Sequence, residues 1–208
     1  MKIEICQSYQ ELSQKACDII LYELKWKKNL LLCAATGSSP TGTYQMLGEE
    51  YREQPELFEE LEILKLDEWG GIAMEHPGTC ESYLQAHLVK PLEIEQSRYY
   101  GFNSSPDDPK QECLNMQDVL EKEGPIDLCI LGLGMNGHLA FNEPAGFLQP
   151  HAHVSSLAPA SLQHSMAAEM RIKPTYGLTM GMADILQSKM ILMLISGPQK
   201  INIVNYFL

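Results

Sequence analysis

The sequence predicts the α/β fold class: a Rossmann-like, open and mostly parallel sheet with helices on both faces. Short apolar runs with almost no polar interruption, such as residues 126–131 (IDLCIL) and 29–35 (NLLLCAA), are typical of parallel strands buried on both faces. Such runs end in clusters of glycine, serine, threonine or acidic residues, and segments of helical periodicity separate them. We expect residues 1–208 to form a single domain.

The first half of the chain alternates between strand and helix patterns. A short edge strand is expected at residues 1–6. Apolar positions spaced by three or four residues predict a helix over about 9–27, with Ser8 or Ser13 as its cap. The further expected elements are a strand at 29–35, a helix reaching about residue 53, a strand at 62–66, a helix at 80–89, a strand at 99–102 and a helix at 111–122.

The central strand, residues 126–131, opens the second half of the chain. The segment from 145 to 162 mixes proline and serine and shows no clear periodicity. The elements expected in this half are a helix at 161–169, a strand at 176–181, a helical turn at 182–186, a strand at 189–197 and a helix after the SGPQK segment. Since no internal repeat, low-complexity segment or linker interrupts the pattern, we expect no second domain.

Composition narrows the class of protein. The chain is 45% hydrophobic, but no apolar run approaches the roughly 18–20 residues of a membrane span. The start, MKIE, lacks the apolar segment of a secretory signal, so we expect a soluble, cytoplasmic protein without a membrane partner. A formal net charge of −12 argues against a nucleic-acid surface, which needs a basic stripe.

Cysteine and histidine spacing gives no reason to expect a metal or cofactor. The six cysteines are scattered without a CxxC pair, which favours reduced core thiols over a disulfide framework or a zinc site. The pair His151 and His153 lacks an evident third ligand. No dinucleotide fingerprint with its downstream acid is present. We therefore expect neither a bound metal nor a cofactor.

The residues after the central strand predict the chemical centre. Gly137 and its neighbours let the backbone turn tightly against a ligand. His138 follows Asn136 and stands five residues before Glu143. A buried strand that ends in glycines, an imidazole and a carboxylate is how an open α/β sheet builds an active site at its carboxyl edge. An ordinary polar turn would explain a lone GxG, but not this combination.

A second corner of the predicted sheet has the features of an anion site. The loop of Thr36, Gly37, Ser38 and Ser39 follows a buried strand, and Pro40 suits the first turn of a following helix. Backbone N–H groups, the positive end of the helix dipole and hydroxyl donors would point at one spot. A plain capped turn would also fit this loop alone; its place after a buried strand favours a phosphate cradle.

Two more corners complete the predicted cleft. Asp67 and Glu68 follow a strand, and adjacent side chains of an extended segment point to opposite sides, so one acid can face the cleft while the other fixes the loop. Lys200 lies at the corner after the last strand. Because parallel strands share one carboxyl edge, we expect the four corners to converge. Such a cleft suits proton transfer on a phosphorylated small molecule, with a carboxylate as base and the pair His138/Glu143 moving protons on oxygen.

The motifs TGSSP, LDEW, GMNGHLAFNEP, TYGLTMG and SGPQK, in that order, resemble the glucosamine-6-phosphate deaminase/isomerase family. LDEW followed by HPGTCESYL is most like its galactosamine-6-phosphate isomerase branch. The resemblance covers essentially the whole chain and implies aldose–ketose isomerisation of a hexosamine 6-phosphate with loss of ammonia. It implies galactosamine 6-phosphate first and glucosamine 6-phosphate next, no cofactor, and either a homo-oligomer or a monomer.

The same resemblance implies roles for individual residues. Asp67 would take the proton at C2 of the opened sugar and return it at C1. His138 would assist ring opening, with Glu143 and Asn136 completing the catalytic group. The implied substrate- and phosphate-binding residues are Thr36, Gly37, Ser38, Ser39, Glu68, Gly137 and Lys200.

Three departures from the family pattern affect these expectations. Asn136 stands where many members carry Asp, so we expect its amide to orient the imidazole without tuning its charge. The family's phosphate-binding arginine has no clear counterpart in residues 163–168, which puts phosphate affinity or sugar choice in question. Relatives continue for roughly one more strand beyond Leu208, so an edge of the sheet is expected to be missing.

Two rival functions stay open. A 6-phosphogluconolactonase resembles this fold and has a similar histidine loop, but it is not expected to carry LDEW or the NEP after the histidine. A non-catalytic sugar-phosphate sensor would use the same cleft. Loss of Asp67 or His138 would have favoured the sensor, and both are present.

Overall fold

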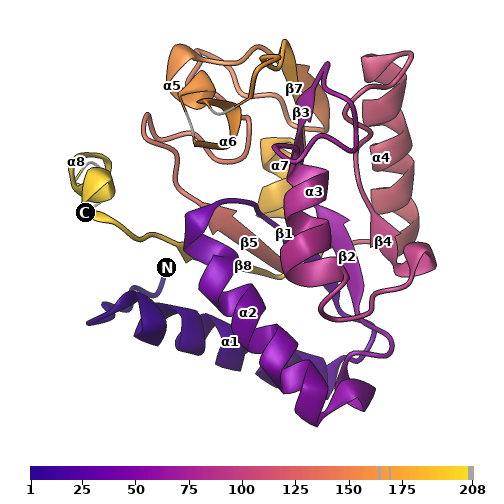
Figure 1. The fold of residues 1–208 in the computed structure, drawn as a ribbon, viewed down its shortest axis with the longest axis vertical. Coiled ribbons are helices and arrows are strands. Elements are labelled where there is room, and N and C mark those ends of the chain that lie inside the picture. Colours follow the sequence, from indigo (N-terminus) through magenta and orange to yellow (C-terminus); the bar gives the residue numbers. More distant parts are fainter. Residues whose placement is uncertain (164, 169, 206–208) are drawn as a thin grey trace.

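The computed structural model describes residues 1–163, 165–168 and 170–205 (Figure 1). A five-stranded parallel sheet forms its centre, with the strand order β4-β2-β1-β5-β8. These strands are β1 (Leu31–Ala34), β2 (Glu62–Lys65), β4 (Tyr99–Tyr100), β5 (Leu128–Gly132) and β8 (Met190–Leu194). All residues of β1 are buried, as expected for a strand covered on both faces. The predicted α/β fold class is therefore confirmed.

Helices cover the sheet and lie between its strands along the chain. They are α1 (Tyr9–Trp26), α2 (Ser38–Glu53), α3 (Cys80–Leu84), α4 (Pro109–Glu123), α5 (Pro159–Leu162), α6 (Ser165–Ala168), α7 (Met182–Leu186) and α8 (Ile201–Val204). Shorter helical turns are η1 (Pro55–Leu57), η2 (Gln85–Val89), η3 (Gln96–Arg98) and η4 (Pro198–Lys200). Figure 1 shows α1 and α2 side by side beneath the parallel sheet. No helix of the described ranges is both long and apolar enough to cross a membrane.

Local sequence signals explain where the first helix begins and which face it buries. The side chain of Ser8 accepts a hydrogen bond from the backbone N–H of Glu11, so Ser8 is the cap, one of the two predicted candidates. Ala16, Ile20 and Leu24 repeat every four residues and are fully or almost fully buried. This apolar stripe packs α1 onto the core.

A second, antiparallel sheet was not predicted. It consists of β3 (Asp67–Gly70), β7 (Tyr176–Thr179) and β6 (His153–Ser155), in the order β3-β7-β6. It lies above the parallel sheet in Figure 1. Residues 67–70 are thus a strand and not a loop, and the strand predicted at 176–181 pairs with them.

Close packing explains why these residues form a second sheet. Gly70 faces the ring of Tyr176, and a Cβ at Gly70 would lie only 2.0 Å from that ring. The rings of Trp69 and Phe141 pack against each other at an interplanar angle of 56° with centroids 4.4 Å apart, inside a small apolar cluster separate from the main core. This cluster gives the second sheet a core of its own.

Two other predictions need correction. Residues 1–6 form no strand: Met1, Ile3 and Ile5 are exposed, and the edges of the parallel sheet are β4 and β8. The helix predicted at 161–169 is divided, because α5 ends at Leu162 and α6 covers residues 165–168; residues 164 and 169 lie outside the described ranges.

Candidate active site

A cavity of about 400 Å³ opens at the carboxyl edge of the parallel sheet. Its lining includes residues from all the predicted corners: Thr36, Gly37, Ser38, Ser39, Asp67, Trp69, His138, Phe141, Ser161 and Lys200. The expected convergence of the four corners is therefore seen in the structure. Glu68, Asn136, Gly137 and Glu143 are not part of this lining.

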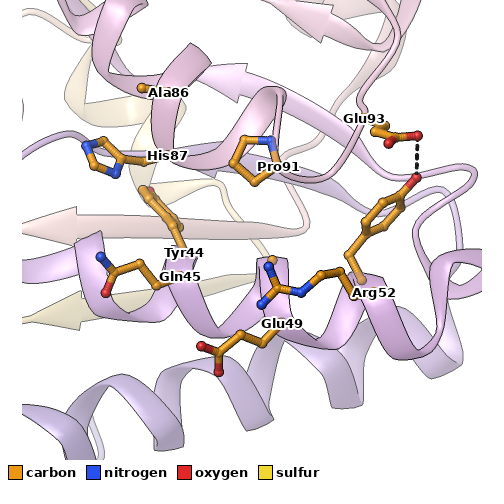
Figure 2. Close-up of a pocket in the computed structure, with 10 residues that line it drawn as sticks. Tyr44, Gln45, Glu49, Arg52, Ala86, His87, Pro91 and Glu93 are labelled. Carbon is orange, nitrogen blue, oxygen red and sulfur yellow. Dashed lines mark hydrogen bonds between the residues drawn. The ribbon is translucent and has the colours of Figure 1, made fainter.

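A larger hollow of about 510 Å³ lies elsewhere, between α2 and η2 (Figure 2). Its walls include Tyr44, Arg52, His87 and Glu93. None of the predicted catalytic residues reaches it. We therefore assign the chemistry to the smaller cavity, where acidic, basic and hydroxyl groups converge.

Asp67 has the environment of a general base. Its side chain is 8% exposed, and its Oδ1 lies 3.8 Å from the thiol of Cys80, which donates to it. Burial, followed by the negative charge of Glu68, raises the pKa of Asp67 to about 7. A carboxyl with this pKa can both remove and return a proton near neutral pH.

Glu68 lies on the opposite side of β3 and is fully buried. Its Oε1 accepts from the backbone N–H groups of Trp69 and Cys80, and its Oε2 from the backbone N–H of Glu81, each at 2.8 Å. Glu68 therefore ties β3 to the N-terminus of α3, and its placement speaks against the predicted contact with substrate. The sequence argument that the two acids take different sides agrees with this arrangement.

A buried lysine completes the surroundings of Glu68. The Nζ of Lys65 donates to Glu68 Oε2 at 2.8 Å and to Glu81 Oε2 at 2.7 Å, and Lys65 is wholly buried. Burial alone would lower the pKa of Lys65, but the two carboxylates outweigh it and raise the pKa. Sequence reasoning missed this ion cluster. Its signal was a lysine inside an otherwise apolar strand, ILKL.

The imidazole of His138 is held by a carboxylate and a hydroxyl. Its Nδ1 lies 3.3 Å from Glu143 Oε2 and 3.3 Å from the hydroxyl of Ser161. Glu143 in turn accepts hydrogen bonds from the Asn136 amide at 2.9 Å, from the backbone N–H of Ala158 at 3.1 Å and from the hydroxyl of Ser161. Ser161 was missed, since its segment has no recognisable motif.

The charges of this pair follow from its hydrogen bonds. Burial would raise the pKa of Glu143, but the donors Ser161, Asn136 and Ala158 outweigh it and keep the pKa below its usual value. Burial lowers the pKa of His138, against the opposing effect of Glu143. A neutral imidazole that donates from Nδ1 to Glu143 leaves Nε2 as a proton acceptor. The pair can therefore shuttle protons between oxygens.

The anion loop, which consists of Thr36, Gly37, Ser38 and Ser39, has the predicted form. Gly37 precedes α2 with φ = 109°, a conformation that favours glycine, and the first N–H groups of α2 have no partners within the helix. Ser39 and Ser196 join the loop to the end of β8 through hydroxyls 3.1 Å apart. Lys200 reaches the same cavity, and burial lowers its pKa. The cavity thus combines amides, hydroxyls and a cation, which suits a phosphate.

The remaining predicted residues have supporting positions. Gly137 takes φ = 88° in the turn that carries His138, and its N–H donates to the carbonyl of Gly134 at 3.1 Å. His151 and His153 bind Asp184 and a backbone carbonyl respectively. Within the described residues no group of three or more His, Cys, Asp or Glu side chains is arranged to hold a metal ion.

The fold and the site together define an enzyme that performs acid–base chemistry on a small anionic molecule. Residues 7–208 match the family described as Glucosamine-6-phosphate isomerases/6-phosphogluconolactonase, and the chain belongs to this family.

Two curated relatives are each 37% identical to the chain. One is the provisionally named deaminase AgaI of Escherichia coli (strain K12), matched over 97% of this chain and 80% of the relative. The other is a glucosamine-6-phosphate deaminase of Geobacillus sp. (strain WCH70), matched over 96% of this chain and 80% of the relative.

Solved structures agree with this assignment. A monomeric glucosamine-6-phosphate deaminase superimposes with a TM-score of 0.93 at 34% identity, covering 100% of this chain and 87% of the other. A 6-phosphogluconolactonase from Trypanosoma brucei gives a TM-score of 0.75 at 20% identity, covering 100% of this chain and 86% of the other. At that identity the lactonase shows a shared fold and nothing more.

Proposed function

We propose that this protein converts a hexosamine 6-phosphate and water into a ketohexose 6-phosphate and ammonia. The observation that carries the proposal is that Asp67, His138 and Lys200 line one cavity with the anion loop. The family membership and the relatives that are named glucosamine-6-phosphate deaminases support it. The loop and Lys200 anchor the phosphate, so that the sugar carbons are held over Asp67.

The groups of the cavity suffice for each proton transfer. His138 moves a proton from the C1 hydroxyl to the ring oxygen, which opens the ring. The ionised Asp67 then removes the proton from C2, while a proton passes from the substrate's ammonium group to the C1 oxygen through His138, and this gives an enolamine. Asp67 returns its proton to C1. The resulting C2 imine is hydrolysed by water, which releases ammonia and leaves the C2 ketone. A base with a pKa of about 7 is matched to this double task.

Within this activity we propose galactosamine 6-phosphate as the preferred substrate, with glucosamine 6-phosphate next. The proposal rests on LDEW and HPGTCESYL, which resemble the galactosamine branch. Trp69 of LDEW lines the cavity, and its buried indole N–H has no protein partner among the described residues. Replacing Trp69 by Phe should therefore change the ratio of kcat/KM between the two C4 epimers.

The proposal extends to the organisation of the protein. We propose one domain, because the cavity is lined by residues from Thr36 to Lys200 of the same chain. Since these lining residues come from one chain, both a monomer and a homo-oligomer are compatible with the cavity. We further propose a cytoplasmic location, where phosphorylated sugars are found, and no nucleic-acid partner for a chain of net charge −12.

The decisive experiment measures ammonia release from both epimers beside hydrolysis of gluconolactone 6-phosphate. We expect ammonia from both amino sugars and no lactone hydrolysis. Lactone hydrolysis without ammonia release would identify a 6-phosphogluconolactonase-type hydrolase instead. Binding of the amino sugars without any turnover would identify a sensor.

A further inference from the structure

Three tyrosine hydroxyls from three different helices bind carbonyl groups in the anion loop or directly before it. The hydroxyl of Tyr44 in α2 donates to the carbonyl of Ala35 at 2.8 Å. The hydroxyl of Tyr83 in α3 donates to the carbonyl of Gly37 at 2.8 Å. The hydroxyl of Tyr9, the first residue of α1, donates to the carbonyl of Ser38 at 2.6 Å. All three residues that carry these carbonyl groups line the cavity. Gly37 directly precedes α2, and Ser38 is its first residue.

The planarity of the peptide bond gives this pattern a consequence. In a trans peptide the C=O and the following N–H point in opposite directions. When Tyr83 and Tyr9 hold the carbonyls of Gly37 and Ser38, the N–H groups of Ser38 and Ser39 are turned to the other side of the loop. The tyrosines are not part of the cavity wall, whereas Ser38 and Ser39 are. The N–H groups therefore point away from the phenols and towards the cavity.

Gly37 is the position where such control is needed most. Its φ of 109° is open to glycine, and without a side chain the peptide after it can rotate more freely than any other peptide of the loop. Its carbonyl lies within hydrogen-bond distance of two hydroxyls, those of Tyr83 at 2.8 Å and Thr41 at 2.9 Å. These two hydroxyls are also hydrogen-bonded to each other at 2.7 Å, so one of them donates to the carbonyl of Gly37 while the other donates to its neighbour. A rotated peptide would present this carbonyl oxygen to the bound anion and repel it.

The direction of the Tyr9 bond is also fixed by its neighbours. The Tyr9 oxygen accepts the backbone N–H of Gly42 at 2.8 Å, so its own proton is left for Ser38. The phenol thus bridges two groups that a regular helix would join directly. A Cβ at Gly42 would lie 3.0 Å from the Tyr9 ring and 2.3 Å from the Ser13 hydroxyl, so this approach depends on glycine.

We infer that Tyr9 and Tyr83 are positioning residues for phosphate, which hold the carbonyls of the anion loop away from the cavity so that its N–H groups face the anion. The inference rests on the proposed function only in taking the loop as the phosphate site. Neither phenol lines the cavity. Their removal should weaken binding of the phosphate and leave the chemical step unchanged.

The test compares Tyr9→Phe and Tyr83→Phe with a matched control, Tyr51→Phe. The Tyr51 hydroxyl binds Glu93 at 2.9 Å in the hollow between α2 and η2, where the dashed line in Figure 2 ends on Glu93. Phenylalanine should keep the ring contacts of Tyr83 with His87, whose centroid lies 4.5 Å away. Tyr44 is unsuitable, because its loss would leave the buried carbonyl of Ala35 unpaired.

Calorimetric titration with inorganic phosphate measures the loop without relying on turnover. We expect Tyr9→Phe to weaken phosphate binding about fivefold, the effect of one ordinary hydrogen bond. Tyr83→Phe should weaken it by a smaller factor, because the hydroxyl of Thr41 can still donate to the carbonyl of Gly37. KM for the amino-sugar phosphate should rise by a similar factor while kcat stays constant. The control Tyr51→Phe should match the wild type in all three quantities.

The outcomes separate this inference from the proposed function. Phosphate binding of wild-type strength in both Tyr9→Phe and Tyr83→Phe would overturn the inference, as would a wild-type protein that binds no phosphate. A fall in kcat with unchanged phosphate affinity would also overturn it, because it would place the phenols in the chemical step. If Tyr9→Phe and Tyr83→Phe bind phosphate more weakly but the wild type releases no ammonia, the positioning role of the two tyrosines stands and the proposed function fails.

Discussion

Replacing Asp67 by Asn should remove activity and at the same time stabilise the folded protein at alkaline pH. The pKa of this carboxyl rises from its ordinary 3.8 to about 7 because of burial and the nearby charge of Glu68. A raised pKa means that ionising the group in the folded state costs free energy. The cost is absent below 3.8, grows as the pH rises, and is complete above about 7.

The size of this effect follows from the pKa difference. A difference of about 3 pH units at 1.36 kcal/mol per unit corresponds to about 4 kcal/mol at pH 8 and to about 2 kcal/mol at pH 5. Asparagine is never ionised and escapes this cost. Any pH-independent effect of the substitution, such as a changed contact with Cys80, cancels when the two pH values are compared. The gain in stability should thus be about 2 kcal/mol larger at pH 8 than at pH 5.

Urea unfolding of both proteins at the two pH values measures the free energies. The ammonia assay should show a loss of about 10²–10⁴-fold in kcat, the usual contribution of a general base. In the wild type, kcat/KM should fall as the pH drops below about 7, where Asp67 takes up a proton. An equal stability difference at both pH values, or normal turnover by the Asn variant, would refute the reasoning.

Three further substitutions test other parts of the structure. Asp127→Asn should destabilise the protein by about 1–3 kcal/mol at neutral pH, because two lysines and a backbone N–H bind this carboxylate and keep its pKa low; the loss should shrink in urea unfolding at acidic pH. Cys80→Ser places a stronger donor beside Asp67, so the acid limb of the kcat/KM profile should move to lower pH. Ser161→Ala removes a donor from Glu143, so kcat for ammonia release should fall about tenfold with little change in KM; a change confined to KM would contradict this role.

The parallel sheet and the four corners were predictable from sequence because short-range patterns specify them. Residues 29–35 and 126–131 are apolar apart from Asn29 and Asp127, and each is followed within a few residues by a polar loop. Parallel strands then bring the loops to one edge by topology alone. Asp67, His138 and Lys200 therefore meet in one cavity, although they are far apart in the sequence.

The second sheet depends on pairings that no local pattern reveals. Residues 67–70 are short and carry two acids, and their partner strand lies far along the chain at 176–179. Ile3 and Ile5 show the opposite error: they alternate as in a strand, but no strand among the described residues pairs with them. Ser161 reaches Glu143 from a segment without periodicity, so only the folded chain shows this contact.

Asp67, the proposed base, lies at the junction between the two sheets. Leu66 alone separates β2 of the parallel sheet from β3 of the antiparallel sheet, and Asp67 is the first residue beyond it. The N–H of Leu66 binds the carbonyl of Ala34 in the first sheet, and Asp67 pairs with Thr179 in the second. Each layer therefore supplies one of the two anchors that aim this carboxylate. We therefore expect substitutions that repack the core of either layer to change the turnover rate before they unfold the protein. Moving this active site to another scaffold would require both sheets and the junction between them.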